Sequence, residues 1–124
     1  MLYYSDGYTI GTNPSHIGGG YTIVDQNNNL IVTRELKRPN FTSNEAEFLG
    51  AFYAIQIANL GDTIILDSTV VETWVHKGFS KARPDLNEDI FEASILAMKK
   101  NLSVIQKPRE QNLAGIYNEF TLKV

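Results

Sequence analysis

The chain has 124 residues, of which 43% are hydrophobic and 10% aromatic, enough for one domain with its own core and too few for two. With 11 Lys and Arg against 14 Asp and Glu, the formal net charge is -3, which argues against a protein that holds nucleic acid by bulk charge alone. The absence of cysteine excludes a disulfide framework and a thiolate metal site. We therefore expect a single domain over residues 1–124, with oxygen atoms as the ligands of any metal.

The first residues of the chain do not resemble a targeting signal. They lack the basic start and the apolar stretch of a signal peptide, and no run of ~18 apolar residues occurs in the sequence. We therefore expect a cytoplasmic protein that does not associate with a membrane. We also expect it to be a monomer.

The first third of the chain has the alternation typical of strands. Residues 2–10 are rich in aromatic and β-branched side chains, and residues 20–25 alternate in the same way after the glycine run 18–20. The asparagines 27–29 favour a turn, because Asn tolerates a positive φ, and residues 30–36 again show a two-residue period. This pattern predicts a meander of three strands.

After Pro39 the spacing of the apolar residues becomes helical. Thr42 and Glu45 form a candidate capping box for a buried helix that ends near residue 59, and the apolar run 63–66 predicts a strand covered on both faces. A short helix over residues 68–76 is predicted next. The remaining predicted elements are a helix that starts at Asp85, with a core face of Phe91, Ser94, Ile95 and Met98, a strand over 102–105 and a helix over 110–121.

The predicted order of elements is β-β-β-α-β-α-α-β-α. A meander followed by alternating helices and strands is typical of an α/β domain in three layers. We therefore expect a mixed five-stranded sheet with helices on both faces.

Three acidic residues lie on elements that are otherwise apolar. Asp6 is inside a predicted strand, Glu47 is one turn into the buried helix, and Asp67 follows the buried strand. Carboxylates that lose their hydration and repel one another persist together only where a cation neutralises them, and hard oxygen ligands favour Mg²⁺ or Mn²⁺. Taken singly, Asp67 is equally suited to cap a helix, and Glu47 to be an exposed residue or a first-turn residue that interacts with the helix dipole.

Five segments, in this order along the chain, resemble motifs of the type 1 ribonucleases H, whose ribonuclease H-like fold has the same order of elements. They are the strand motif Ser5-Asp6-Gly7, the hairpin residues Asn13-Pro14 with Gly18-Gly19-Gly20-Tyr21, the helix segment Thr42-Ser43-Asn44-Glu45-Ala46-Glu47-Phe48, the strand end Leu66-Asp67-Ser68, and the stretch Arg109-Glu110-Gln111-Asn112-Leu113-Ala114-Gly115. Each motif is short. Their common order and spacing over most of the chain make the resemblance specific.

The resemblance implies an endonuclease that cuts the RNA strand of RNA/DNA hybrids with two Mg²⁺ ions, or with Mn²⁺. Two ions ~4 Å apart can activate the attacking water and stabilise the leaving 3′-oxygen. By the same resemblance, Asp6 would bridge both ions, and Glu47 and Asp67 would complete opposite sides of the cluster.

The family usually has a fourth ligand, an Asp near the start of the final helix, where this chain offers Asn112 or Gly115. An Asn oxygen can bind Mg²⁺, so we expect Asn112 to be the fourth ligand, with a helix N-cap as the alternative role. Glu119 lies on the same helical face but two turns, ~10.5 Å, further on, and is the reserve ligand. Neither His16 nor His76 matches the histidine that many family members have in the loop before this helix.

Three residues match positions at which the family contacts the 2′-hydroxyl of RNA, and they are Asn13, Thr42 and Asn44. A protein that distinguishes RNA from DNA needs hydrogen-bond donors and acceptors for that hydroxyl. Thr42 has an alternative role, because it is equally suited to cap its helix. The segment 74–83 matches a basic handle of some family members. It carries only Lys77, Lys81 and Arg83, so we expect few phosphate contacts from it.

These observations predict a ribonuclease H-like domain that hydrolyses the RNA of RNA/DNA hybrids. The missing fourth Asp leaves open a catalytically impaired module that binds nucleic acid or protein. A nuclease of the same superfamily acting on structured DNA is a further alternative, disfavoured by the low basic content.

Overall fold

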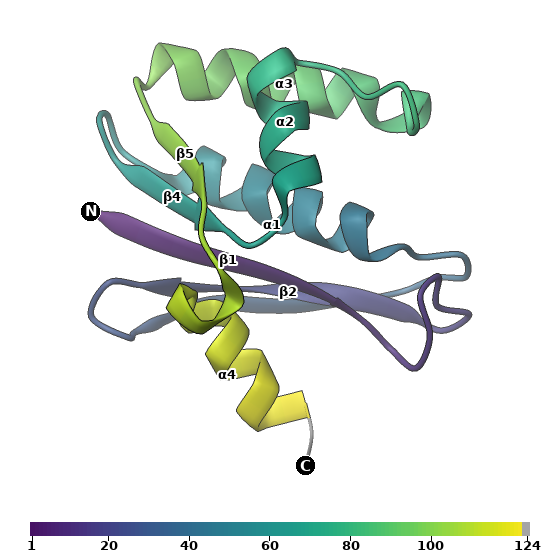
Figure 1. The fold of residues 1–124 in the computed structure, drawn as a ribbon. Helices are drawn as coiled ribbons and strands as arrows, with labels where there is room; N and C mark the ends of the chain where they lie inside the picture. Colours follow the sequence, from purple (N-terminus) through teal and green to yellow (C-terminus); the bar gives the residue numbers. More distant parts are fainter. Residues whose placement is uncertain (123–124) are drawn as a thin grey trace.

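The computed structural model describes residues 1–122. Eight-residue strands dominate the first third of the chain, and helices alternate with short strands in the remainder (Figure 1). In chain order the elements are β1 (Leu2–Thr9), β2 (Gly18–Asp25), β3 (Leu30–Lys37), α1 (Ser43–Ile57), β4 (Thr63–Leu66), α2 (Thr69–Lys77), α3 (Asn87–Lys99), β5 (Ser103–Gln106) and α4 (Leu113–Leu122), with short 3-10 helices at Pro84–Leu86 and Arg109–Gln111.

The five strands form one mixed sheet in the order β3-β2-β1-β4-β5. The pairs β1–β2 and β2–β3 are antiparallel, as expected of a meander, whereas β1–β4 and β4–β5 are parallel and are joined through helices. The predicted order of elements and the predicted mixed five-stranded sheet are therefore confirmed.

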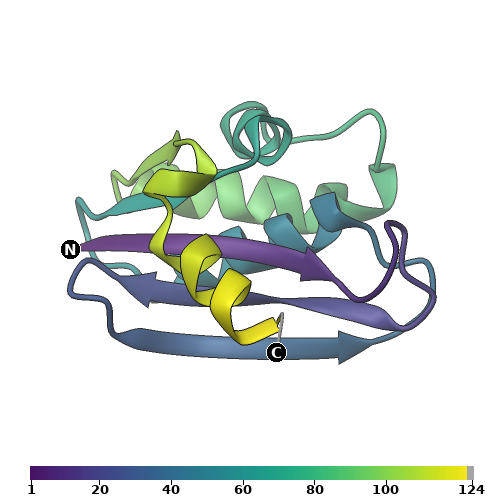
Figure 2. The ribbon, with the colours of Figure 1, turned by 60° about the horizontal axis from the view of Figure 1, so that its bottom comes forward.

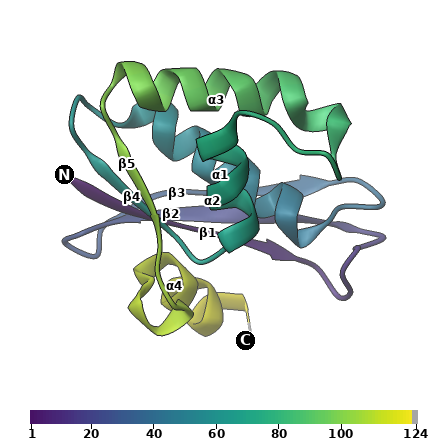
Figure 3. The ribbon, with the colours of Figure 1, turned by 45° about the horizontal axis from the view of Figure 1, so that its top comes forward.

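Helices cover both faces of the sheet. α1, α2 and α3 lie on one face, and α4 lies alone on the other, across β1 and β2 (Figures 2 and 3). All eight residues of β2 are buried, because α1 packs on one side of this strand and α4 on the other. The carboxyl end of β4 lies beside the middle of β1 in this covered part of the sheet, because Tyr4 pairs with Ile65, and the end of a parallel strand is where a site in an open α/β sheet is expected.

β1 and α1 touch through their main chains. A Cβ atom on Gly7 would lie 2.4 Å from the backbone nitrogen of Glu47, so any larger residue at this position would force strand and helix apart. A Cβ atom on Gly50 would lie 2.5 Å from Oγ of Ser5, a side-chain atom, so α1 packs closely on β1 there as well. The contact brings the middle of α1 against the middle of β1, next to Asp6.

The structure differs from the predicted elements in the buried face of α3. Phe91 and Met98 are 60% and 73% exposed, whereas the small residues Ala93 and Ala97 are buried together with Ile90. α3 packs against α1, and its alanines allow the two helices to approach closely. The predicted face, built on the largest apolar side chains, was therefore wrong.

None of the helices within residues 1–122 combines the length and the apolar character needed to cross a bilayer.

Candidate active site

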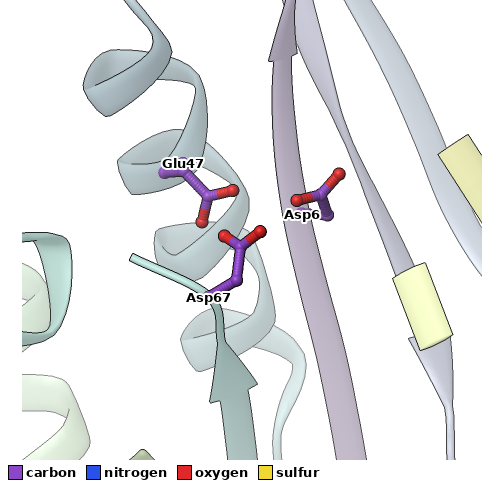
Figure 4. Close-up of side chains that lie close together, drawn as sticks. All are labelled: Asp6, Glu47 and Asp67. Carbon is purple, nitrogen blue, oxygen red and sulfur yellow. The ribbon is translucent and has the colours of Figure 1, made fainter. Parts of the chain in front are cut away.

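Three carboxylates from distant parts of the sequence converge at one edge of the β1–α1 contact (Figure 4). Asp6 comes from β1, Glu47 from the first turns of α1, and Asp67 from the residue after β4. One oxygen from each residue can be chosen so that all three lie within 4.8 Å of one another. This is the group of acidic residues that the sequence singled out.

The alternative roles considered for two of these residues do not agree with the structure. The N-cap of α2 is Ser68, whose Oγ accepts a hydrogen bond from the backbone nitrogen of Val71, so Asp67 caps no helix. Glu47 is only 5% exposed and therefore does not lie in solvent. Asp6 is 1% exposed, while the side chain of Asp67 keeps 16% of its surface accessible.

Two oxygens of the cluster are buried and accept no hydrogen bond from the described residues. The backbone nitrogen of Gly7 donates to Oε1 of Glu47 at 2.7 Å, and Nδ2 of Asn118 donates to Oδ2 of Asp6 at 2.9 Å. The remaining oxygens, Oε2 of Glu47 and Oδ1 of Asp6, lack a partner within residues 1–122. A buried acceptor without a donor is costly, and a cation between these oxygens would remove that cost.

The proton affinities of the cluster reflect its burial and its shared charge. Burial raises the pKa of Asp6 to about 6, against the opposing hydrogen bond from Asn118, and the charge of Asp67 adds to the rise. Burial also raises the pKa of Glu47 well above its ordinary value, with the charges of Asp67 and Asp6 as further causes. Both shifts mean that the ionised carboxylates need a positive charge nearby. These buried oxygens fit a divalent ion such as Mg²⁺ or Mn²⁺.

Asn118 holds Asp6 in place, a role that was not predicted from the sequence. Its Oδ1 accepts a hydrogen bond of 2.6 Å from Oγ1 of Thr22, so its amide nitrogen is turned toward Asp6. Oγ1 of Thr22 also lies 3.1 Å from Oγ1 of Thr33 on the neighbouring strand. The available signal was an Asn four residues after the buried Ala114, on the inner face of a helix, where a polar group needs a specific partner.

No role was predicted for Arg109, which is the first residue of the motif before the final helix. The structure places it beside the cluster. Its Nη1 lies 3.6 Å from Oδ2 of Asp67 and 4.0 Å from Oδ1 of Asp6. The side chain is 56% exposed. These are contacts between charges at a distance longer than an ordinary hydrogen bond.

In the structure Asn112 is the N-cap of α4, which is the alternative role predicted for it. Its Oδ1 accepts hydrogen bonds from the backbone nitrogens of Ala114 at 3.0 Å and Gly115 at 3.2 Å. Its Nδ2 donates to the backbone oxygen of Ser5 at 3.0 Å. Because both acceptor sites of the amide oxygen are used, this geometry does not agree with the metal-ligand role predicted for Asn112.

The reserve ligand and the two histidines lie outside the cluster. Glu119 is exposed and is not part of the group formed by Asp6, Glu47 and Asp67. His16 is exposed in the loop between β1 and β2. His76 is exposed on α2, with Nε2 2.9 Å from the backbone oxygen of Val104.

The three residues predicted to contact RNA lie around the start of α1, the helix that carries Glu47. Asn13 and Ser43 bond reciprocally, since Nδ2 of Asn13 donates to Oγ of Ser43 and the backbone nitrogen of Ser43 donates to Oδ1 of Asn13. Thr42 is the N-cap, and its Oγ1 accepts from the backbone nitrogen of Glu45. The side chain of Asn44 is half-buried and forms no hydrogen bond with residues 1–122.

Arg83 belongs to an internal network and is a poor candidate for a phosphate contact. Its guanidinium donates to Oε1 of Glu45, to both carboxylate oxygens of Asp85 and to Oγ1 of Thr42. Arg38 also pairs with Glu45. The segment expected to act as a basic handle therefore offers Lys77 and Lys81, both exposed.

Comparisons with known proteins identify structural relatives only. No family model matches the sequence, and no curated protein matches it. The RNase H1 of the halophilic archaeon Halobacterium salinarum is 22% identical, with a TM-score of 0.68 over 99% of this chain and 98% of that chain. The N-terminal RNase H domain of a Mycobacterium tuberculosis protein is 21% identical, with a TM-score of 0.66 over 91% of this chain and 90% of that one.

A third similar structure is LC11-RNase H1, solved in complex with an RNA/DNA hybrid. It is 22% identical, with a TM-score of 0.63 over 90% of this chain and 87% of that chain. The likeness extends over nearly the whole chain in all three cases, at identities that establish the fold alone. The resemblance stated from the sequence motifs is confirmed at this level: the chain has the ribonuclease H-like fold.

Proposed function

We propose that this protein is a divalent-metal-dependent endonuclease that hydrolyses the RNA strand of RNA/DNA hybrids. The observation that carries the proposal is the convergence of Asp6, Glu47 and Asp67 at the carboxyl end of β4, with two buried oxygens left without donors. The fold, shared with RNase H enzymes over nearly the whole chain, supports it. In this proposal the three carboxylates are the metal ligands.

A bound divalent ion would activate the attacking water and stabilise the leaving 3′-oxygen, and the family resemblance implies two such ions. The protein's part is to keep the ligands in fixed positions. The Gly7 backbone nitrogen orients Glu47, and Asn118 orients Asp6, so that the second oxygen of each carboxylate faces the shared space. Asp67, the most accessible of the three, lies on the side that a substrate would approach.

The first test is cleavage of an end-labelled RNA/DNA hybrid, beside duplex DNA, duplex RNA and a branched DNA, with Mg²⁺ and then Mn²⁺. We expect cleavage of the RNA strand of the hybrid alone, and its loss by at least 100-fold in Asp67→Asn. Asp89→Asn, an equivalent change at an exposed position on α3, is the matched control and is expected to behave as wild type.

Other results would support the alternatives. Binding of the hybrid without cleavage in either metal would identify a binding module. Cleavage of the branched DNA in place of the hybrid would identify a nuclease for structured DNA. Cleavage that persists in Asp67→Asn would show that the carboxylate cluster is not the site.

We propose Asn44, Asn13 and Thr42 as the contacts that distinguish RNA from DNA, with Asn44 the most available of them. Its amide forms no hydrogen bond with the described residues, so it can donate and accept at a 2′-hydroxyl. Asn44→Ala is expected to raise KM for the hybrid about 10-fold, the cost of ~1.4 kcal/mol for a lost hydrogen bond, with little change in kcat or Tm. Kinetics on the hybrid with melting curves would check this, and an unchanged KM would exclude the contact.

A further inference from the structure

Arg109 places a positive charge next to two of the three carboxylates. It begins the short 3-10 helix that precedes α4, and its Nη1 is within 4.0 Å of oxygens on both Asp6 and Asp67. The oxygen of Asp6 that Arg109 approaches is Oδ1, one of the two buried oxygens that accept no hydrogen bond from the described residues. Asp6 itself is only 1% exposed. The cluster therefore already contains one cation that belongs to the chain.

The stem of Arg109 lies next to position 115, at the distance of ordinary van der Waals contact. A Cβ atom on Gly115 would lie 3.6 Å from Cγ of Arg109 and 3.7 Å from Cγ of Asp6. Position 115 thus faces the cluster directly from the first turn of α4, and it carries no side chain. The start of α4 contributes no carboxylate to the group, and the stem of Arg109 borders the space instead.

The charges of the cluster balance with one metal ion. Three ionised carboxylates carry three negative charges, and one divalent ion with the guanidinium carries three positive ones. With a second divalent ion the positive charges would number five, which exceeds the three carboxylates and still exceeds the four negative charges present when one substrate phosphate is bound. Like charges in a partly buried site repel strongly, so the guanidinium disfavours a second ion.

We propose that Arg109 takes the place of the second metal ion, so that the three carboxylates hold one divalent ion. The inference rests on the proposed function, because it concerns the same site. It departs from the two-ion arrangement that the resemblance implies. Arg109 then supplies the second positive charge against the phosphate of the substrate, from a side chain that is exposed enough to move.

The test counts Mn²⁺ ions by titration calorimetry and by electron paramagnetic resonance. It uses the full chain alone and bound to a hybrid whose RNA strand is made resistant to cleavage by phosphorothioate linkages. We expect one ion per chain in both states of the wild type. Arg109→Ala is expected to bind the first ion at least 5-fold more tightly and to admit a second ion when the hybrid is bound, while Arg109→Lys keeps the count at one.

Lys107→Ala is the matched control, since it removes an exposed positive charge two residues away from Arg109. We expect it to leave the number of ions and their affinity unchanged. A spin-coupled pair of Mn²⁺ ions in the wild type with hybrid would overturn the inference. So would an Arg109→Ala protein, folded by circular dichroism, whose ion count and affinity equal those of the wild type.

The test of the role of Arg109 can fail independently of the test of the proposed nuclease activity. A wild-type protein that binds one Mn²⁺ but never cleaves the hybrid contradicts the proposed function and leaves the role of Arg109 intact. A protein that cleaves the hybrid with two ions supports the function and contradicts the role of Arg109. Absence of any Mn²⁺ binding contradicts both.

Discussion

At the scale of single residues, Asp6 is the group whose environment departs most from that of an ordinary aspartate. It is buried, held by Asn118 on one side and next to Asp67 and Glu47 on the other. Without a metal, its ionised form therefore opposes folding. This residue gives a direct test of the electrostatics of the cluster.

Asp6→Asn is expected to stabilise the metal-free protein at high pH. The folded protein binds the Asp6 proton more tightly than the unfolded chain, because burial raises the pKa from 3.8 to about 6, so stability falls as the pH rises through that interval. The loss corresponds to about 3 kcal/mol well above pH 6, since one pKa unit is worth ~1.4 kcal/mol. In EDTA, we expect a higher Tm for the variant at pH 8 and a much smaller difference at pH 4.

A melting temperature of Asp6→Asn at or below that of the wild type at pH 8 would contradict the expected cost. Asp89→Asn, at an exposed site, controls for the change in net charge. Glu47 acts in the same direction as Asp6, because its pKa is also raised, so the decline in wild-type stability is expected to continue above pH 6.

At the scale of elements, the start of α4 is fixed to β1 by one side chain. Asn112, which is fully buried, caps α4 through Ala114 and Gly115 and donates to the backbone oxygen of Ser5. The adjacent Asp6 is held from the same helix by Asn118. α4 therefore supports Asp6, one of the proposed metal ligands, from the face of the sheet opposite to α1.

Asn112→Ala is expected to destabilise the protein by about 2–3 kcal/mol, through the lost cap and the unpaired buried oxygen of Ser5. Asn112→Asp keeps an acceptor for the two backbone nitrogens and loses only the donor, so we expect a smaller loss. Urea denaturation would measure both. If Asn112 bound a metal, Asn112→Ala would instead weaken the binding of Mn²⁺ by removing a ligand oxygen, and Asn112→Asp would strengthen it by adding a negative charge.

The order and type of the elements could be predicted from the sequence because each has a local pattern. The first three strands alternate every two residues, β4 is a continuous apolar run, and α1 carries its own cap at Thr42. The face of α3 could not be predicted from side-chain size, because close helix packing favours Ala93 and Ala97 over Phe91 and Met98.

The carboxylates of the site could be found from the sequence because an acidic residue on an apolar element is unusual. The groups that position and neutralise them could not. Thr22 and Asn118 are 96 residues apart, and their hydrogen bond leaves no local pattern. The direction in which Arg109 points depends on the 3-10 turn before α4, which no local sequence pattern predicts.

At the scale of the whole molecule, the site joins parts of the chain that are distant in sequence. Asp6, Glu47 and Asp67 lie on β1, α1 and the end of β4, so an ion between them would link three elements of the fold. Binding to the folded state alone raises stability by mass action. The metal is therefore expected to act on the stability of the complete domain.

Mn²⁺ at about ten times its dissociation constant is expected to add ~1.4 kcal/mol to the free energy of unfolding, or about 5 °C in Tm. Asp6→Asn is expected to reduce this shift strongly, and Asp89→Asn to leave it unchanged. Melting curves with and without the metal would check both. A wild-type Tm that does not respond to millimolar Mn²⁺ would count against a metal site at this cluster.

The contact between β1 and α1 at Gly7 also has a consequence for the size of the ion. Because the main chains of strand and helix touch there, the backbone distance between Asp6 and Glu47 is fixed, and the bond from the Gly7 nitrogen holds one oxygen of Glu47 in place. Mg²⁺ binds oxygen at about 2.0–2.1 Å, whereas Ca²⁺ needs about 2.3–2.6 Å and more ligands. If the cluster binds a metal, we therefore expect it to prefer the smaller ions, and we expect the close contact at Gly7 to contribute to that preference.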